Sequence, residues 1–130
     1  LYWKPYEKPG MRPHAATVAT ARMGGGTPPI ETPRGWLTLW HGVEPGAEVG
    51  IYRTYWSILD TDDPSRVVAT DHVPLIEPAP HLTAHLDSLK YLDSVVFTTG
   101  IVDGGDHYLV ASGEADLACR LTRIDKARFA

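Results

Sequence analysis

The chain has 130 residues, with 12 Lys and Arg against 16 Asp and Glu, and a formal net charge of −4. This acidic balance excludes a general nucleic-acid binder, which needs a basic face to neutralise phosphates. No run of about 18 apolar residues occurs, so we expect neither a membrane-spanning helix nor a membrane partner. The hydrophobic content of 43% favours a packed core over wholesale disorder.

The strand signals follow one another along the chain. Residues 1–21 are predicted to be an irregular lead-in, because prolines and glycines interrupt every pattern there. A glycine loop covers residues 24–29, and residues 81–90 fit either a short helix or a loop. Six strands are predicted, over 35–42, 51–59, 67–70, 95–102, 107–111 and 118–124, with a hairpin turn at 103–106. No long amphipathic helix intervenes, so the pattern favours an antiparallel all-β fold, with a sandwich, a barrel and part of a propeller all open.

Three basic residues stand out in this first half. Arg22 precedes the loop Gly24-Gly25-Gly26, whose backbone N–H groups are suited to cradle an anion, and His41 ends the next predicted strand. We therefore expect an anion site formed by Arg22, His41 and the loop. Arg53 lies on an apolar, aromatic strand, where an unpaired charge is costly, so it needs a cleft or an acidic partner. The candidate partners are Glu31, Glu44 and Asp60.

Two carboxylates, Glu114 and Asp116, lie at the end of a predicted strand. At a spacing of two they point to the same side of an extended chain, where they are suited to bind sugar hydroxyls or to act as acid or base. The chain also has 4 Trp and 6 Tyr, which either stack on sugar rings or fill a β-core.

The lone Cys119 excludes an internal disulfide framework. Its neighbours Leu117 and Leu121 predict a buried, structural thiol, and we expect a reducing, cytoplasmic location. His81 and His85 have the spacing of a zinc pair on a helix, but no Cys or second motif accompanies them. We therefore expect no metal and no cofactor.

Six motifs in a fixed order suggest a family, and together they run from about Arg22 to Ile124. They are Gly24-Gly25-Gly26-Thr27-Pro28-Pro29, Trp40-His41-Gly42, Tyr52-Arg53, Leu59-Asp60-Thr61-Asp62-Asp63-Pro64-Ser65, Val95-Val96-Phe97-Thr98-Thr99-Gly100 and Gly113-Glu114-Ala115-Asp116. In order and spacing this series resembles glycoside hydrolase family 130, the β-mannoside phosphorylases and β-mannosidases.

The resemblance implies that residues 1–130 are part of a β-propeller glycosidase domain, with the C-terminal blades of a five-bladed propeller in residues 22–130. It implies inverting cleavage of a β-linked mannoside or oligosaccharide, either by inorganic phosphate as co-substrate or by water. The family's general acid is expected outside this chain, so the isolated chain is expected to be inactive. Sheet edges and apolar faces that further blades would cover predict that it associates, for example as a homo-oligomer. The alternative is a non-catalytic carbohydrate-binding or structural β-module.

The resemblance also assigns residues. The phosphate-binding set is Arg22, where the family usually has Lys, together with His41 and Tyr52. Asp116 contacts the sugar in the family, and Glu114 and Arg53 complete the expected substrate-binding set.

Overall fold

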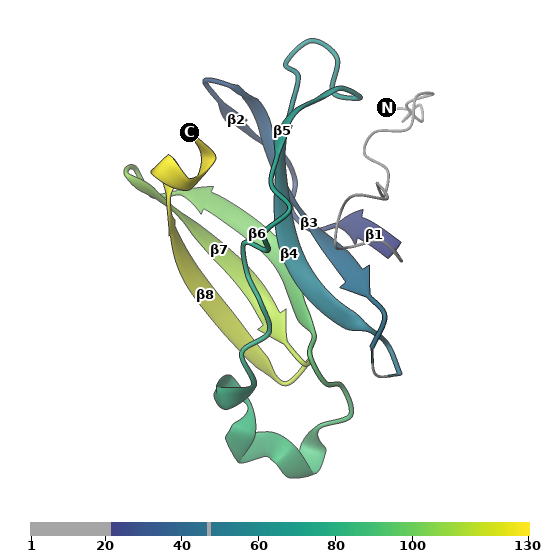
Figure 1. Cartoon of the computed structure of the whole chain (residues 1–130). Coiled ribbons are helices and arrows are strands. Elements are labelled where there is room, and N and C mark those ends of the chain that lie inside the picture. Colours follow the sequence, from purple (N-terminus) through teal and green to yellow (C-terminus); the bar gives the residue numbers. More distant parts are fainter. Residues whose placement is uncertain (1–21, 47) are drawn as a thin grey trace, which may run out of the picture.

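The computed structural model describes residues 22–46 and 48–130, so the predicted lead-in at 1–21 lies outside the described residues. Two antiparallel sheets lie side by side, joined by a long segment that runs through two short helical turns (Figure 1). The expected all-β fold is confirmed, because helix within the described residues is confined to three short 3₁₀ segments.

The first sheet is built on one long hairpin. Its strands are β1 (Arg22–Gly25), β2 (Ile30–Thr32), β3 (Gly35–Glu44), β4 (Ile51–Leu59) and β5 (Val67–Thr70). Both β1 and β2 pair with the same edge of β3, at opposite ends, and β5 pairs with the other edge of β4. The predictions for β4 and β5 are confirmed residue for residue, and β3 runs two residues further than expected. The three-residue β2 is not predicted, because it is too short to show alternation.

The second sheet is a simple meander of three strands. They are β6 (Val96–Asp103), β7 (His107–Glu114) and β8 (Ala118–Asp125), in the order β6-β7-β8. The predicted hairpin turn is confirmed: Gly105 has a φ of +95°, and the N–H of Gly104 donates to the carbonyl of His107 at 2.9 Å. Residues 81–90, predicted as a short helix or a loop, fall in the 3₁₀ turns η1 (Pro80–Leu82) and η2 (Ala84–Leu89), while η3 (Lys126–Phe129) ends the chain.

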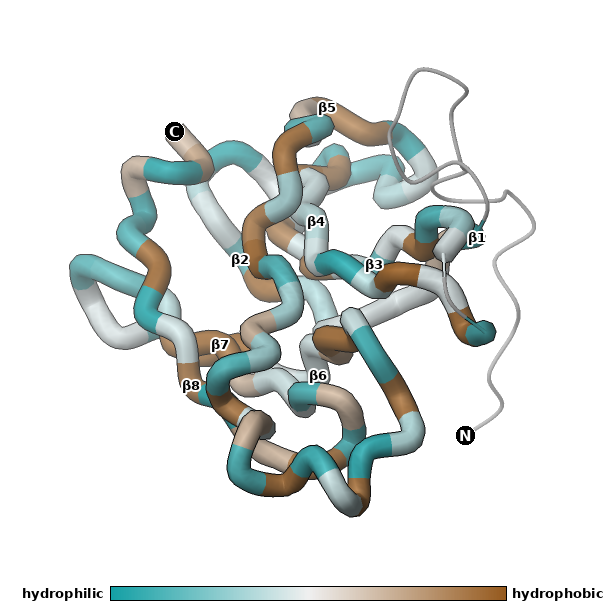
Figure 2. Tube along the Cα trace, turned by 60° about the horizontal axis from the view of Figure 1, so that its bottom comes forward, coloured by the Kyte–Doolittle hydropathy of each residue, from teal (hydrophilic) through white to brown (hydrophobic). Residues whose placement is uncertain are grey.

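The two sheets share one hydrophobic core. Buried and more exposed residues alternate along much of β6, β7 and β8, which gives the second sheet one buried face, whereas β3 and β4 have buried residues on both faces. Figure 2 shows the hydropathy of each residue along the chain. The buried members of the core are Leu37, Leu39, Trp56, Ile58, Ile76, Val96, Tyr108, Val110, Ile124 and Phe129. Within it the hydroxyls of Thr54 on β4 and Thr98 on β6 lie 2.6 Å apart, a buried hydrogen bond that ties the sheets together.

The opposite face of the first sheet carries a smaller cluster. The rings of Trp40 and Tyr55 stack there with centroids 4.8 Å apart, and Met23 packs against them. Trp40 also donates from its indole nitrogen to the hydroxyl of Ser57 at 3.0 Å. These aromatic residues therefore serve packing, one of the two roles that the composition leaves open.

Candidate functional site

An aromatic wall forms where the two sheets meet. The imidazole of His41 on β3 stacks on Tyr52 of β4, with ring centroids 5.5 Å apart, and tilts against Phe97 of β6 at 4.6 Å. Gly24 pairs with His41 across β1 and β3, and a Cβ on Gly24 would lie only 2.6 Å from the ring. Glycine at this position therefore leaves the space that the imidazole occupies.

This wall borders a hollow of about 210 Å³, called the inner hollow below. The lining residues are Val49, Tyr52, Leu92, Val95, Phe97 and Asp116. They come from the β3–β4 hairpin, from β4, from the segment before β6, from β6 itself and from the β7–β8 turn. The site is thus assembled from segments that are far apart in the sequence.

Asp116 reaches the inner hollow through an unusual turn. Ala115 and Asp116 both have positive φ, 50° and 55°, and the N–H of Leu117 donates to the carbonyl of Glu114 at 2.9 Å. The N–H of Ala115 is also held, at 2.9 Å, by the carbonyl of Val95. An exposed Asp116 carboxylate oxygen accepts a hydrogen bond from the Tyr91 hydroxyl at 3.1 Å, and this bond raises the pKa of Tyr91. The turn therefore presents a carboxylate at the edge of the inner hollow.

Arg22 supplies positive charge near the same place. Its Nη2 donates to the carbonyl of Val49, one of the lining residues, at 3.0 Å, and its side chain is otherwise exposed. Burial lowers the pKa of His41 below its ordinary value of 6.5, and the charge of Arg22 lowers it further. His41 is therefore held neutral at neutral pH, so Arg22 carries the charge of this pair.

Arg53 lies on the opposite face of the first sheet from its neighbour Tyr52. Its guanidinium pairs with Glu44 at 2.5 Å and with Glu77 at 3.1 Å. Alternation along β4 explains the separation, because adjacent residues of a strand point to opposite faces. The predicted need for an acidic partner is met by Glu44, and the structure does not bring Arg53 to the inner hollow.

The prediction that Glu114 and Asp116 point to the same side is wrong. The chain leaves the extended conformation at Ala115, so the two carboxylates diverge. The Glu114 side chain is only 3% exposed and pairs with Arg120 at 2.7 Å, while its other oxygen accepts from the N–H of Ala79 at 3.0 Å. Glu114 thus ties the second sheet to the connecting segment.

The glycine loop is not an anion cradle of the expected kind. The N–H groups of Gly26 and Thr27 both donate to the carbonyl of Leu39, at 3.1 and 3.0 Å, so these two donors are already used. A Cβ on Gly26 would lie 2.8 Å from that same oxygen. The loop is glycine-rich because it packs closely on β3.

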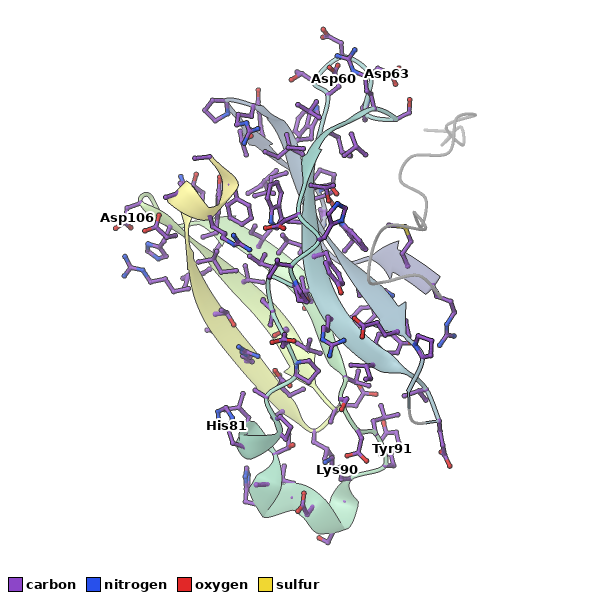
Figure 3. All side chains as sticks on the ribbon, viewed as in Figure 1. Asp60, Asp63, His81, Lys90, Tyr91 and Asp106 are labelled. Carbon is purple, nitrogen blue, oxygen red and sulfur yellow. The ribbon has the colours of Figure 1, made fainter. Side chains whose placement is uncertain are left out.

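Two further expectations concern residues that lie at the surface. Cys119 is exposed, so the prediction of a buried thiol is wrong: it lies on the outer side of β8, where Leu121 is also 75% exposed. His81 and His85 lie apart from the inner hollow, on the exposed turns η1 and η2; Figure 3 labels His81. Within residues 22–46 and 48–130, no group of three or more His, Cys, Asp or Glu side chains is placed to hold a metal. In the same described part, no helix is long and apolar enough to cross a membrane.

Two residues of the site carry no role in the sequence prediction. Phe97 belongs to a quoted motif, and its aromatic side chain within an otherwise β-branched run is the signal that marks it. Tyr91 precedes β6 in an irregular segment and gives no local signal, because its contact with Asp116 exists only in the folded chain.

Comparison with known proteins identifies the family of the chain. The family model described as beta-1,4-mannooligosaccharide phosphorylase matches residues 7–128. A beta-1,2-mannobiose phosphorylase from Thermoanaerobacter sp. (strain X514) is 34% identical over 118 residues, which are 91% of this chain and 37% of that protein. A 4-O-beta-D-mannosyl-D-glucose phosphorylase from Bacteroides fragilis is 33% identical over 115 residues, covering 85% of this chain and 28% of that protein.

A solved structure is similar as well. The beta-1,2-mannobiose phosphorylase from Listeria innocua, in complex with beta-1,2-mannobiose, superposes with a TM-score of 0.71 and 30% identity. The match covers 93% of this chain and 32% of that chain. This chain thus spans about a third of the length of the relatives it matches.

Proposed function

Since the chain belongs to glycoside hydrolase family 130, we propose that it forms part of an enzyme that cleaves β-linked mannosides with inversion, by phosphate or by water. The observation that carries this proposal is a hollow lined by Tyr52 and Asp116. His41 stacks on Tyr52 beside it, and Arg22 binds the carbonyl of the lining residue Val49. Tyr52, Asp116, His41 and Arg22 are four of the six residues that the family resemblance assigned from the sequence. The other two, Arg53 and Glu114, are engaged in ion pairs elsewhere and are left out of the proposed site.

The chemistry of the four residues suits a sugar beside an anion. The Arg22 guanidinium offers positive charge and a planar set of N–H donors to a phosphate. The neutral imidazole of His41 is held in place between Tyr52 and Phe97. Asp116 accepts hydrogen bonds only, so it is suited to orient sugar hydroxyls. Attack of phosphate or water on the anomeric carbon would break the glycosidic bond, and we assign the general acid to the part of the relatives that this chain does not span.

We further propose that the two sheets are neighbouring blades of a five-bladed β-propeller. In support, β1 and β2 follow each other along one edge of β3, so the first sheet has the meander order of a propeller blade. The second sheet repeats the meander and packs against the first through a shared core. The inner hollow then lies where the two blades adjoin.

The test measures cleavage of β-1,2-mannobiose and β-1,4-mannobiose by the protein as its gene encodes it, with and without inorganic phosphate. Phosphorolysis predicts phosphate-dependent release of mannose 1-phosphate, and Arg22→Ala should raise the KM for phosphate by roughly tenfold or more, the effect of losing one charge-assisted contact. Arg123→Ala is the matched control, because Arg123 is an exposed Arg paired with Asp106 near the β6–β7 turn.

Each outcome separates the alternatives. If the rate of cleavage does not depend on phosphate and is unchanged in Arg22→Ala, the reaction is hydrolysis and phosphorolysis is ruled out. Binding of mannosides with no cleavage under either condition would instead identify a carbohydrate-binding module and refute the proposed enzyme.

A further inference from the structure

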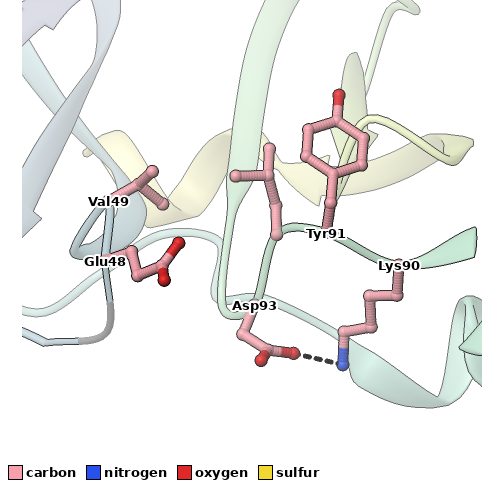
Figure 4. Close-up of a pocket in the computed structure, with 6 residues that line it drawn as sticks. Glu48, Val49, Lys90, Tyr91 and Asp93 are labelled. Atoms are coloured by element: carbon pink, nitrogen blue, oxygen red, sulfur yellow. Dashed lines mark ion pairs between the residues drawn. The ribbon is translucent and has the colours of Figure 1, made fainter.

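A second groove, of about 330 Å³ and called the outer groove below, adjoins the inner hollow. It lies between the tip of the β3–β4 hairpin and the segment that precedes β6 (Figure 4). The lining residues are Glu48, Val49, Lys90, Tyr91, Leu92 and Asp93. Because Val49 and Leu92 line both spaces, the outer groove lies directly next to the inner hollow.

Tyr91 gives the outer groove an aromatic surface. Its side chain is 68% exposed, which leaves its ring face open to a ligand, while its hydroxyl is held by Asp116 at 3.1 Å. Such a ring, anchored at its polar end, is suited to pack against the C–H face of a sugar. The same hydrogen bond connects the outer groove with the carboxylate of the proposed mannoside site.

The charges of the outer groove favour a neutral ligand over an anion. Lys90 forms an ion pair with Asp93, drawn as the dashed line in Figure 4, and Glu48 faces them from the hairpin. Two carboxylates against one ammonium leave a negative balance, which repels phosphate or any phosphorylated compound. Their oxygens and the Lys90 N–H groups are nevertheless good partners for hydroxyl groups.

We propose that the outer groove binds the next sugar unit of a β-mannoside longer than a disaccharide. This inference rests on the proposed function. Tyr91 stacks on that sugar, and Glu48, Lys90 and Asp93 bind its hydroxyls. In this proposal, residues 90–93, which lie outside the six sequence motifs, give the enzyme a preference for oligosaccharides.

The test compares kcat/KM for the disaccharide, trisaccharide and tetrasaccharide of whichever β-mannoside series the protein cleaves. For the unaltered protein, kcat/KM for the trisaccharide should exceed that for the disaccharide by roughly two- to tenfold, the usual worth of one aromatic contact. Tyr91→Ala should bring this ratio close to one. Tyr91→Phe keeps the ring and loses only the hydroxyl, so it should keep the ratio even where both rates fall.

Lys90→Ala should also lower the ratio, and Lys126→Ala is its matched control, because Lys126 pairs with Asp103 near the β6–β7 turn. A ratio near one in the unaltered protein, or a ratio that Tyr91→Ala leaves unchanged, would overturn the inference while leaving the proposed function intact. Absence of cleavage of every mannoside would overturn both.

Discussion

Replacing Arg120 by alanine tests whether Glu114 is a structural residue rather than a sugar ligand. The change leaves a carboxylate that is 3% exposed with a single remaining hydrogen bond, from Ala79. Breaking a fully buried pair costs about 3–5 kcal/mol. The Arg120 side chain is 24% exposed, so water can reach the freed carboxylate, and we expect a loss of about 2–3 kcal/mol in the free energy of unfolding.

Urea unfolding, followed by tryptophan fluorescence, measures this loss as a lower midpoint at an unchanged slope. Arg123→Ala is the control, since its pair with Asp106 is exposed on both sides and is expected to contribute less than about 1 kcal/mol. Adding Glu114→Gln to Arg120→Ala removes the unpaired charge and should recover part of the loss. If Arg120→Ala is no more destabilising than Arg123→Ala, the buried ion pair does not hold Glu114, and the reasoning is refuted.

Three further predictions concern the packing around the site. Gly26→Ala should destabilise the chain by roughly 1–3 kcal/mol in thermal denaturation, because the added Cβ lies 2.8 Å from the Leu39 carbonyl; an unchanged melting temperature would contradict the close approach. Thr98→Val leaves the buried hydroxyl of Thr54 without its partner at 2.6 Å and should cost about 1–3 kcal/mol in urea; a neutral effect would show that the bond is dispensable. Burial lowers the pKa of His41, so the unfolded chain takes up a proton first as the pH falls. The contribution of His41 to the free energy of unfolding should therefore be complete above pH ~6.5 and decline below it. In His41→Gln the decline of the free energy of unfolding with falling pH should be correspondingly smaller.

Much of the fold follows from local patterns. The strands β4 and β5 are predicted to the residue because their β-branched and aromatic runs are bounded by turn residues. The wrong predictions concern residues whose environment depends on distant parts of the chain. Cys119 has apolar neighbours, yet no described residue covers the outer side of β8, so its thiol is exposed.

For the site too, local patterns predict some residues and miss those that depend on distant contacts. Motif order predicts Arg22, His41, Tyr52 and Asp116 as site residues, and this assignment stays a prediction. In the structure Tyr52 and Asp116 line the inner hollow, His41 stacks on Tyr52 and Arg22 binds the carbonyl of Val49. Tyr91 is recognisable only from its contact with Asp116. Spacing alone also fails for Glu114, since two residues share a side only while the backbone stays extended.

In the β7–β8 turn, backbone stability and the proposed function of Asp116 favour different residues. Two consecutive left-handed residues are most easily supplied by glycine and asparagine, and Ala115 and Asp116 adopt this conformation at a steric cost. Selection for thermal stability alone would therefore favour glycine or asparagine at this hairpin and remove the carboxylate from the inner hollow. Engineering of more stable variants should accordingly relax the turn at Ala115, where the side chain is a buried methyl group, and leave Asp116 unchanged.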